Sequence, residues 1–259
     1  MALADFSMNW FSLKGKTALV TGGNTGLGRA FSVAYATAGA NVYSVSLDAA
    51  GDNVTKELLE SLDGNYASCT LDLTSEQHCA KAIELCLDNF NQLDIVHNNA
   101  GICINKEFPG FDRPSWDKMV AINLTAAYEL SNEAGKVFKN QQSGKLIYTA
   151  SLYSTLGGQW SPAYSATKHG IAGLAKAYCD ELAQYNVQSN AIAPGYFQTE
   201  LTQQTKADTQ RNQFIEQHTP AGHWGKPEDL MGTAIFLASK ASDFINGAVL
   251  PVDGGYLTR

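Results

Sequence analysis

Apolar, β-rich runs alternate with amphipathic segments along all 259 residues of the chain. The intervening segments, of roughly 10–20 residues, have the length that a crossover between parallel strands requires. Runs that are apolar almost throughout indicate a sheet covered on both faces. We therefore predict an α/β fold, a single-domain Rossmann-type doubly wound sheet of about seven parallel strands flanked by helices, over residues 1–259. The strand candidates are KTALVTG, NVYSVSL, NYASCTL, LDIVHNN, GKLIYTA, VQSNAIA and GAVLPVD.

Charge and cysteine content narrow the class of protein. The formal net charge is −7, with acids and bases mixed along the chain, so we expect no nucleic-acid partner. The five cysteines form no CxxC pair, which is typical of reduced thiols in a cytoplasmic protein. The N-terminal segment lacks a basic head followed by an apolar stretch, and no apolar run has membrane-spanning length. We therefore expect neither a signal peptide nor a membrane partner.

The segment TGGNTGLG follows the first apolar run and opens a helical pattern. Glycines allow a tight turn and let the backbone approach a pyrophosphate at the helix N-terminus. The alternative is a strand-to-helix turn without a ligand. Because the segment stands between a strand and a helix, we predict nucleotide contacts at Gly22, Asn24, Thr25, Gly26, Leu27 and Gly28.

The second run ends in YSVSLDAA, where an acid would hold the adenosine ribose. Ser46 stands at the expected place and Asp48 follows two residues later. Between Lys16 and Lys56 the only cation is Arg29, on the first helix, whereas a 2′-phosphate needs a guanidinium or ammonium group. The sequence therefore favours NAD(H) over NADP(H) as the cofactor. A helix-capping or loop role for Asp48 is the alternative.

The third and fourth runs end in residues that suit the rest of a nucleotide. Asp72 and the Leu73 amide, in TLDLTS, are placed to meet the adenine edge, although Asp72 also suits a helix N-cap. His97 should pack in or near its strand, and it has no partners at metal-ligand spacing, so no metal site is predicted. In NNAG, small residues allow close approach of a cofactor to Asn99, Ala100 and Gly101.

Tyr164 and Lys168 lie four residues apart in SPAYSATKHG, which places them on one helix face. A phenol has an ordinary pKa near 10, and a neighbouring cation should lower it toward the range useful for proton transfer. Ser151, at the end of GKLIYTAS, is placed to polarise the same substrate oxygen. Asn123 interrupts a helical pattern and is expected to bind backbone and water in a proton relay. The alternative for the YxxxK pair alone is a surface pair.

TGxxxGxG, NNAG, a serine and YxxxK in this order resemble the short-chain dehydrogenase/reductase family over essentially the whole chain. The resemblance implies that Tyr164 is the catalytic acid/base and that Lys168 is its partner and a ribose ligand. It implies that Ser151 binds the substrate oxygen and that Asn123 takes part in the relay. Hydride would pass between nicotinamide and a carbinol or carbonyl carbon.

Residues 194–227 are rich in Gln and Thr and follow the sixth run, at the edge where such sheets bind ligands. We predict a flap over the substrate there; an ordinary surface excursion is the alternative. The resemblance implies that Pro194, Gly195 and Thr199 close the nicotinamide pocket. Gln159 and Trp160, with Ser151 and Tyr164, are the predicted substrate ligands.

Within the family, APGYFQT, TPAGHWGKPEDLMG and the final VDGGYL resemble sugar-acid enzymes, the group of 2-dehydro-3-deoxy-D-gluconate 5-dehydrogenase and gluconate 5-dehydrogenase. Members of that group carry arginines soon after NNAG, where this chain reads ICINKEF, and some carry one where Trp160 stands. Arginine is the natural clamp for a carboxylate. Either a neutral polyol or keto-sugar binds against Gln159 and Trp160, or other cations hold an acid. The candidates are Lys106, His169, Lys206 and Arg211.

The family resemblance also implies a homotetramer, with a dimer as the alternative. Two other functions remain open on the sequence. One is an NADPH-linked reductase of bulkier carbonyl compounds, and the other is a nucleotide-binding scaffold without turnover. The intact set of Ser151, Tyr164 and Lys168 favours an enzyme over a scaffold.

Overall fold

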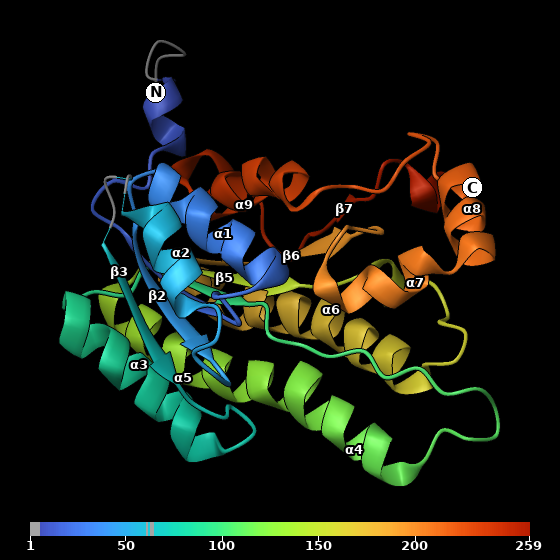
Figure 1. Ribbon diagram of the computed structural model, residues 1–259. Coiled ribbons are helices and arrows are strands. Elements are labelled where there is room, and N and C mark those ends of the chain that lie inside the picture. Colours follow the sequence, from blue (N-terminus) through green and yellow to red (C-terminus); the bar gives the residue numbers. More distant parts are fainter. Residues whose placement is uncertain (1–5, 61, 63–64) are drawn as a thin grey trace.

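The computed structural model describes residues 6–60, 62 and 65–259. Residues 1–5, which open the segment considered for a signal peptide, lie outside the described residues. A central sheet with helices on both faces forms the molecule (Figure 1). Within the described ranges, no helix is both long enough and apolar enough to cross a bilayer.

Seven strands of the described chain form one parallel sheet in the order β3-β2-β1-β4-β5-β6-β7. The strand order reverses between β1 and β4, and ligands bind at such a switch point in open α/β sheets. The predicted α/β architecture is therefore confirmed. The strands are Thr17–Thr21 (β1), Asn41–Ser46 (β2), Tyr66–Thr70 (β3), Ile95–Asn98 (β4), Gly144–Thr149 (β5), Val187–Pro194 (β6) and Val249–Val252 (β7).

The helices form a layer on each face of the sheet. Helices α1, α2 and α9 lie on one face, and α3, α5 and α6 on the other, while α7 and α8 extend from the end of β6 (Figure 1). A π-helical turn, Ala121–Thr125, joins α4 to α5. The helices are Gly26–Thr37 (α1), Asp52–Leu59 (α2), Glu76–Phe90 (α3), Arg113–Val120 (α4), Ala126–Gln141 (α5), Pro162–Leu182 (α6), Gln203–Ala207 (α7), Thr209–His218 (α8) and Met231–Ala238 (α9).

Strand β1 shows why the sequence selects this layering. Successive side chains of a strand point to opposite faces. Ala18 and Val20 belong to the core under α1 and α9, whereas Leu19 belongs to the core under α3, α5 and α6. Every residue of β1 is buried, as expected for a strand between two helical layers. Two cores therefore hold the strands, and their carboxyl ends form one edge.

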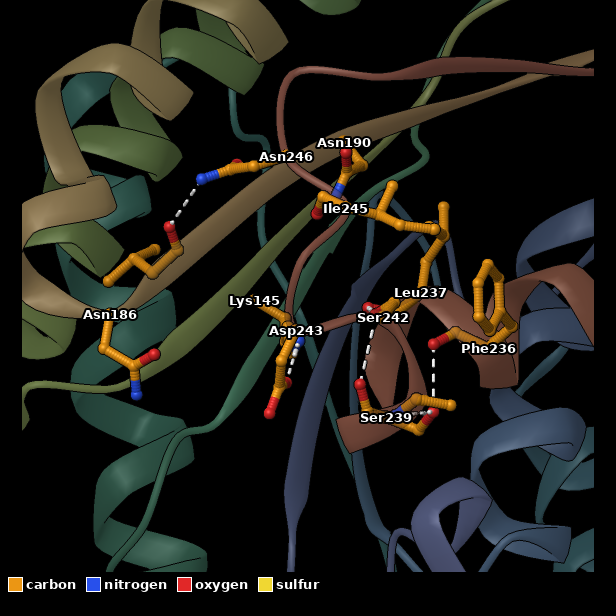
Figure 2. Close-up of polar contacts among 12 residues, drawn as sticks. Lys145, Asn186, Asn190, Phe236, Leu237, Ser239, Ser242, Asp243, Ile245 and Asn246 are labelled. Carbon is orange, nitrogen blue, oxygen red and sulfur yellow. Dashed lines mark hydrogen bonds and ion pairs between the residues drawn. The ribbon is translucent and has the colours of Figure 1, made fainter. Parts of the chain in front are cut away.

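Asparagine side chains fix the position of the last strand. Asn190, 1% exposed on β6, donates from Nδ2 to the Ile245 carbonyl (2.8 Å) and accepts at Oδ1 from the Ala248 N–H (3.0 Å). Asn246 Oδ1 accepts from the Ser189 N–H at 2.7 Å. Figure 2 shows these side chains around the connection that enters β7. The strand that follows brings the C-terminal segment to the carboxyl edge of the sheet.

Candidate active site

The glycine loop forms a tight turn at the start of α1, whose N-terminus has no side-chain cap. Gly22 and Gly26 have positive φ, +61° and +51°, which favours glycine. A Cβ at Gly28 would lie 2.0 Å from the Gly22 carbonyl oxygen, so no side chain fits there. Thr25, the N-cap residue of α1, forms no side-chain cap. First-turn N–H groups are thus left for a ligand, and the loop fits the pyrophosphate of a dinucleotide.

The Arg29 side chain stabilises this loop through hydrogen bonds to its backbone. Its Nε and Nη2 donate to the Asn24 carbonyl at 3.0 and 2.6 Å, and Nε also donates to Thr55 Oγ1 at 3.0 Å. Asn24 Nδ2 in turn donates to the Asp48 carbonyl at 2.8 Å. The guanidinium is therefore engaged by the loop itself. It does not serve as a free cation near the ribose position.

Two adjoining cavities, of about 370 and 220 Å³, follow the loop along the carboxyl edge. They share Gly22, Thr25, Ala100 and Gly101. The smaller cavity is lined by the predicted adenosine contacts Asn24, Ser46, Asp48, Asp72 and Leu73. The larger is lined by the predicted Gly26, Leu27, Gly28, Asn99, Ser151, Tyr164, Lys168, Pro194, Gly195 and Thr199.

Tyr164 and Ser151 face each other in the larger cavity, at the start of α6 and the end of β5. Burial raises the pKa of Tyr164 above its ordinary value, and the nearby Cys103 thiol adds to the rise, while a hydrogen bond with the Ser151 hydroxyl opposes it. The Tyr153 ring packs edge-on against Tyr164, with centroids 5.9 Å apart. The expectation that the neighbouring ammonium lowers this pKa is wrong for this arrangement, because burial has the larger effect.

Lys168 is the buried cation of the site. It is 4% exposed, its Nζ donates to the Thr149 carbonyl at 2.7 Å, and Nζ lies 5.5 Å from the centroid of the Tyr164 ring. Burial lowers the pKa of Lys168 to about 8. The Thr149 carbonyl therefore positions the ammonium beside the phenol ring; the sequence gives no signal for this contact.

Asn123 lies in the π-helical turn, a feature that often marks functional sites. Its Oδ1 accepts from the Ile102 N–H and its Nδ2 donates to the Ile102 carbonyl, both at 2.8 Å. Nδ2 also lies 3.4 Å from Thr167 Oγ1 on α6. Asn123 thus joins the segment after NNAG to the helix that carries Tyr164. A proton relay through it stays a prediction.

A buried polar chain runs beneath the site from α1 to β5. Tyr35 Oη lies 2.8 Å from His97 Nδ1, and His97 Nε2 lies 3.1 Å from Thr149 Oγ1, which donates to Asn99 Oδ1 at 3.1 Å. Since the Thr149 hydroxyl donates to Asn99, His97 must donate from Nε2 and accept at Nδ1. Burial lowers the pKa of His97 to about 3, so it is neutral. The predicted packing of His97 in its strand is confirmed.

The predicted substrate ligands before α6 lie away from the larger cavity. Gln159 is exposed, and neither Gln159 nor Trp160 is among the described residues that line the cavity with Tyr164. Trp160 instead faces Arg211 of α8, whose guanidinium carbon lies 4.7 Å from the Trp160 ring centroid. Glu200 also lines the cavity, although nothing in the sequence marks it, since an acid after Thr199 carries no distinguishing signal.

The parallel sheet, the glycine loop at its switch point and the Ser–Tyr–Lys group define a dinucleotide-binding oxidoreductase fold. A family model described as enoyl-(acyl carrier protein) reductase matches residues 22–257. The chain belongs to the short-chain dehydrogenase/reductase family.

Particular relatives cover nearly the whole chain. The uncharacterized oxidoreductase YgcW of Escherichia coli (strain K12) is 52% identical over 258 residues, covering 100% of this chain and 98% of the relative. The 2-dehydro-3-deoxy-D-gluconate 5-dehydrogenase of Bacillus subtilis (strain 168) is 42% identical over 249 residues, 96% of this chain and 97% of the relative. A crystal structure of a gluconate 5-dehydrogenase from Burkholderia cenocepacia J2315 with NADP and tartrate has a TM-score of 0.91 at 32% identity, covering 97% and 98% of the two chains.

Proposed function

We propose that the protein interconverts a secondary alcohol and a ketone on a gluconate-type sugar acid, with NAD(H) as cofactor and Tyr164 as the acid/base. The observation that carries this proposal is the meeting of Ser151, Tyr164 and Lys168 with the glycine loop in one cavity. The substrate class is supported by the relative at 42% identity, which is named as a dehydrogenase of 2-dehydro-3-deoxy-D-gluconate.

The chain's own residues supply the proton chemistry. In reduction, the protonated phenol of Tyr164 donates its proton to the ketone oxygen and becomes phenolate. In oxidation, the phenolate form accepts the proton of the alcohol and becomes the phenol again. The Ser151 hydroxyl donates a hydrogen bond to the same oxygen. Lys168, fixed by the Thr149 carbonyl, supplies positive charge where negative charge develops on that oxygen. When bound along the two cavities, the dinucleotide supplies the hydride donor or acceptor.

The preference for NAD(H) is proposed from the smaller cavity. Two carboxylates, Asp48 and Asp72, line it, and no lysine or arginine is among its described lining residues. Hydrogen bonds from the Thr74 N–H and hydroxyl lower the pKa of Asp72 and keep it ionised. These negative charges would repel a 2′-phosphate. The NADP in the relative's crystal structure is a property of that relative.

Tyr164→Phe tests the acid/base assignment. Removing the hydroxyl should lower kcat about 10²- to 10⁴-fold for sugar-acid oxidation, because the proton transfer is lost. NADH binding, followed by fluorescence titration, should not change. Tyr66→Phe is the matched control, since Tyr66 lies on β3 and bonds Asp52 away from the site. A Tyr164→Phe enzyme with near-native kcat would rule the assignment out.

Native enzyme tests the cofactor and the reaction class. Titration with NADH and NADPH should give the lower Kd for NADH, and a clear NADPH preference would contradict the cofactor proposal. Turnover should appear with 2-dehydro-3-deoxy-D-gluconate or D-gluconate under one of the two cofactors. Tight dinucleotide binding without turnover of any sugar acid would refute the function.

A further inference from the structure

Four cations are candidates for binding the carboxylate of an acid substrate, and two of them are engaged elsewhere. Lys106 forms an ion pair with Asp112 at 2.5 Å. His169 is exposed on α6, and its Nδ1 lies 2.9 Å from the Ser165 carbonyl of the preceding turn. The two remaining candidates, Lys206 and Arg211, lie on α7 and α8. Each stands over an indole ring.

Arg211 presents a guanidinium without an acidic partner. Within the described part of the chain, no carboxylate lies within 4.0 Å of its nitrogens, and no protein group accepts a hydrogen bond from its side chain. The guanidinium carbon stands 4.7 Å from the Trp160 centroid, and the residue is half-buried. An arginine held by an aromatic face keeps its N–H groups for a planar, two-pronged contact. Carboxylate is the natural partner of that geometry.

Backbone strain at Trp160 supports a functional role for the pair. Trp160 has φ +67°, a region that bulky residues rarely adopt. The other described non-glycine residues with positive φ, Asn91, Gln142 and Asn186, are C-caps of helices. The Trp160 carbonyl accepts from the Lys106 N–H at 2.9 Å, which holds the loop in this conformation. Such strain persists where the surrounding structure imposes it and concentrates at binding sites.

Cys103 lies near both Arg211 and the Tyr164–Lys168 pair. Burial raises the pKa of the Cys103 thiol, and the charges of Lys168 and Arg211 both oppose the rise. Cys103 is also among the groups that raise the pKa of Tyr164. The Cys103 thiol also donates to Ser161 Oγ at 4.0 Å, and Ser161, the N-cap of the helix that carries Tyr164, follows Trp160, against whose ring Arg211 stands. These contacts place Arg211 beside the start of α6.

We propose that Arg211, held by Trp160, is the specificity-determining residue that binds the substrate carboxylate. This inference rests on the proposed sugar-acid function. Arg211, from α8, would thus take the place of the arginines that this sequence lacks after NNAG and before Tyr164. Lys206 suits this role less well, because the groove of about 790 Å³ that it lines also holds the carboxylates of Glu200 and Glu228, which compete for its ammonium. This groove shares Thr199 and Glu200 with the larger cavity, and Lys206 Nζ stands 5.8 Å from the Trp224 ring centroid.

The test compares a charged substrate with its neutral counterpart. kcat/KM is measured for D-gluconate and D-gluconamide, or for 2-dehydro-3-deoxy-D-gluconate and its amide, with native enzyme, Arg211→Met, Arg211→Lys and Lys206→Met. Arg211→Met should lower kcat/KM for the acid roughly 10- to 100-fold, mainly through KM, because charge-assisted hydrogen bonds are lost. Its values for the amide and its NADH affinity should stay near native. Arg211→Lys should restore part of the kcat/KM for the acid. Lys206→Met should keep near-native kcat/KM for both the acid and the amide.

Three outcomes would overturn the inference while leaving the proposed function intact. They are an Arg211→Met enzyme that loses acid and amide turnover equally, one that loses neither, and a Lys206→Met enzyme with the same selective loss. Native enzyme without turnover of any sugar acid would instead refute the proposed function itself. Unchanged NADH affinity and an unchanged circular dichroism spectrum show that the variants are folded.

Discussion

Lys168 is predicted to destabilise the fold that it serves. Burial lowers its pKa from the ordinary 10.5 to about 8, and the side chain is 4% exposed. A lysine in the unfolded chain keeps the ordinary value. The difference corresponds to about 3 kcal/mol of stability that the buried charge costs the native state at neutral pH.

The pH dependence of this cost has a definite sign. Because the folded pKa lies below the unfolded one, the full cost applies below pH 8 and disappears as pH rises toward 10.5. Lys168→Met removes the charge but leaves the Thr149 carbonyl unpaired, which costs about 1–3 kcal/mol at every pH. The free energy of unfolding of native protein should therefore rise relative to Lys168→Met by about 1 kcal/mol between pH 7 and pH 9.

Urea unfolding at pH 7, 8 and 9, followed by tryptophan fluorescence at one protein concentration, measures this difference. Lys176→Met, which removes an exposed lysine from the same helix, controls for the loss of one positive charge. The variant at Lys168 should also lose turnover. A native-minus-variant difference that is constant from pH 7 to pH 9, or that falls, would refute the electrostatic account of the site.

Two further predictions concern the buried polar chain and the glycine loop. The pKa of His97 is lowered to about 3, so native stability should fall as pH drops below about 6.5, by about 2 kcal/mol at pH 5, relative to His97→Gln in urea titrations; parallel curves for the two proteins would contradict this. Gly28→Ala places a Cβ 2.0 Å from the Gly22 carbonyl oxygen, so NADH affinity should fall by about two orders of magnitude in a fluorescence titration. Gly173→Ala, which has open space around the added Cβ, should bind NADH normally.

The fold followed from the sequence because each strand lies between two helical layers. Such strands are buried at every position, as β1 and β6 show, and the helical segments between them have crossover length. The cavity residues were found for a related reason. Gly22 directly follows β1, and Ser151 and Ala100 stand two residues after the ends of β5 and β4. The carboxyl ends of these parallel strands meet at one edge of the sheet.

Other parts of the site depend on three-dimensional packing that local patterns do not contain. The pKa of Tyr164 is governed by burial among side chains from several elements, so the spacing to Lys168 alone predicts the wrong direction. Trp160 and Arg211 meet across a long stretch of chain, and nothing local pairs them. The homotetramer and the cytoplasmic location stay predictions, since they concern contacts and surroundings beyond one described chain.

The positive φ of Trp160 implies a trade-off between thermal stability and substrate selectivity. Glycine would adopt that backbone freely and relieve about 1 kcal/mol, so selection for thermal tolerance alone would favour it at position 160. The same exchange would remove the surface on which Arg211 rests. Under the proposed role of Arg211, laboratory evolution for thermal stability alone would therefore yield more stable variants with lower selectivity for acid substrates. Screening each round with both a sugar acid and its neutral amide would retain that selectivity.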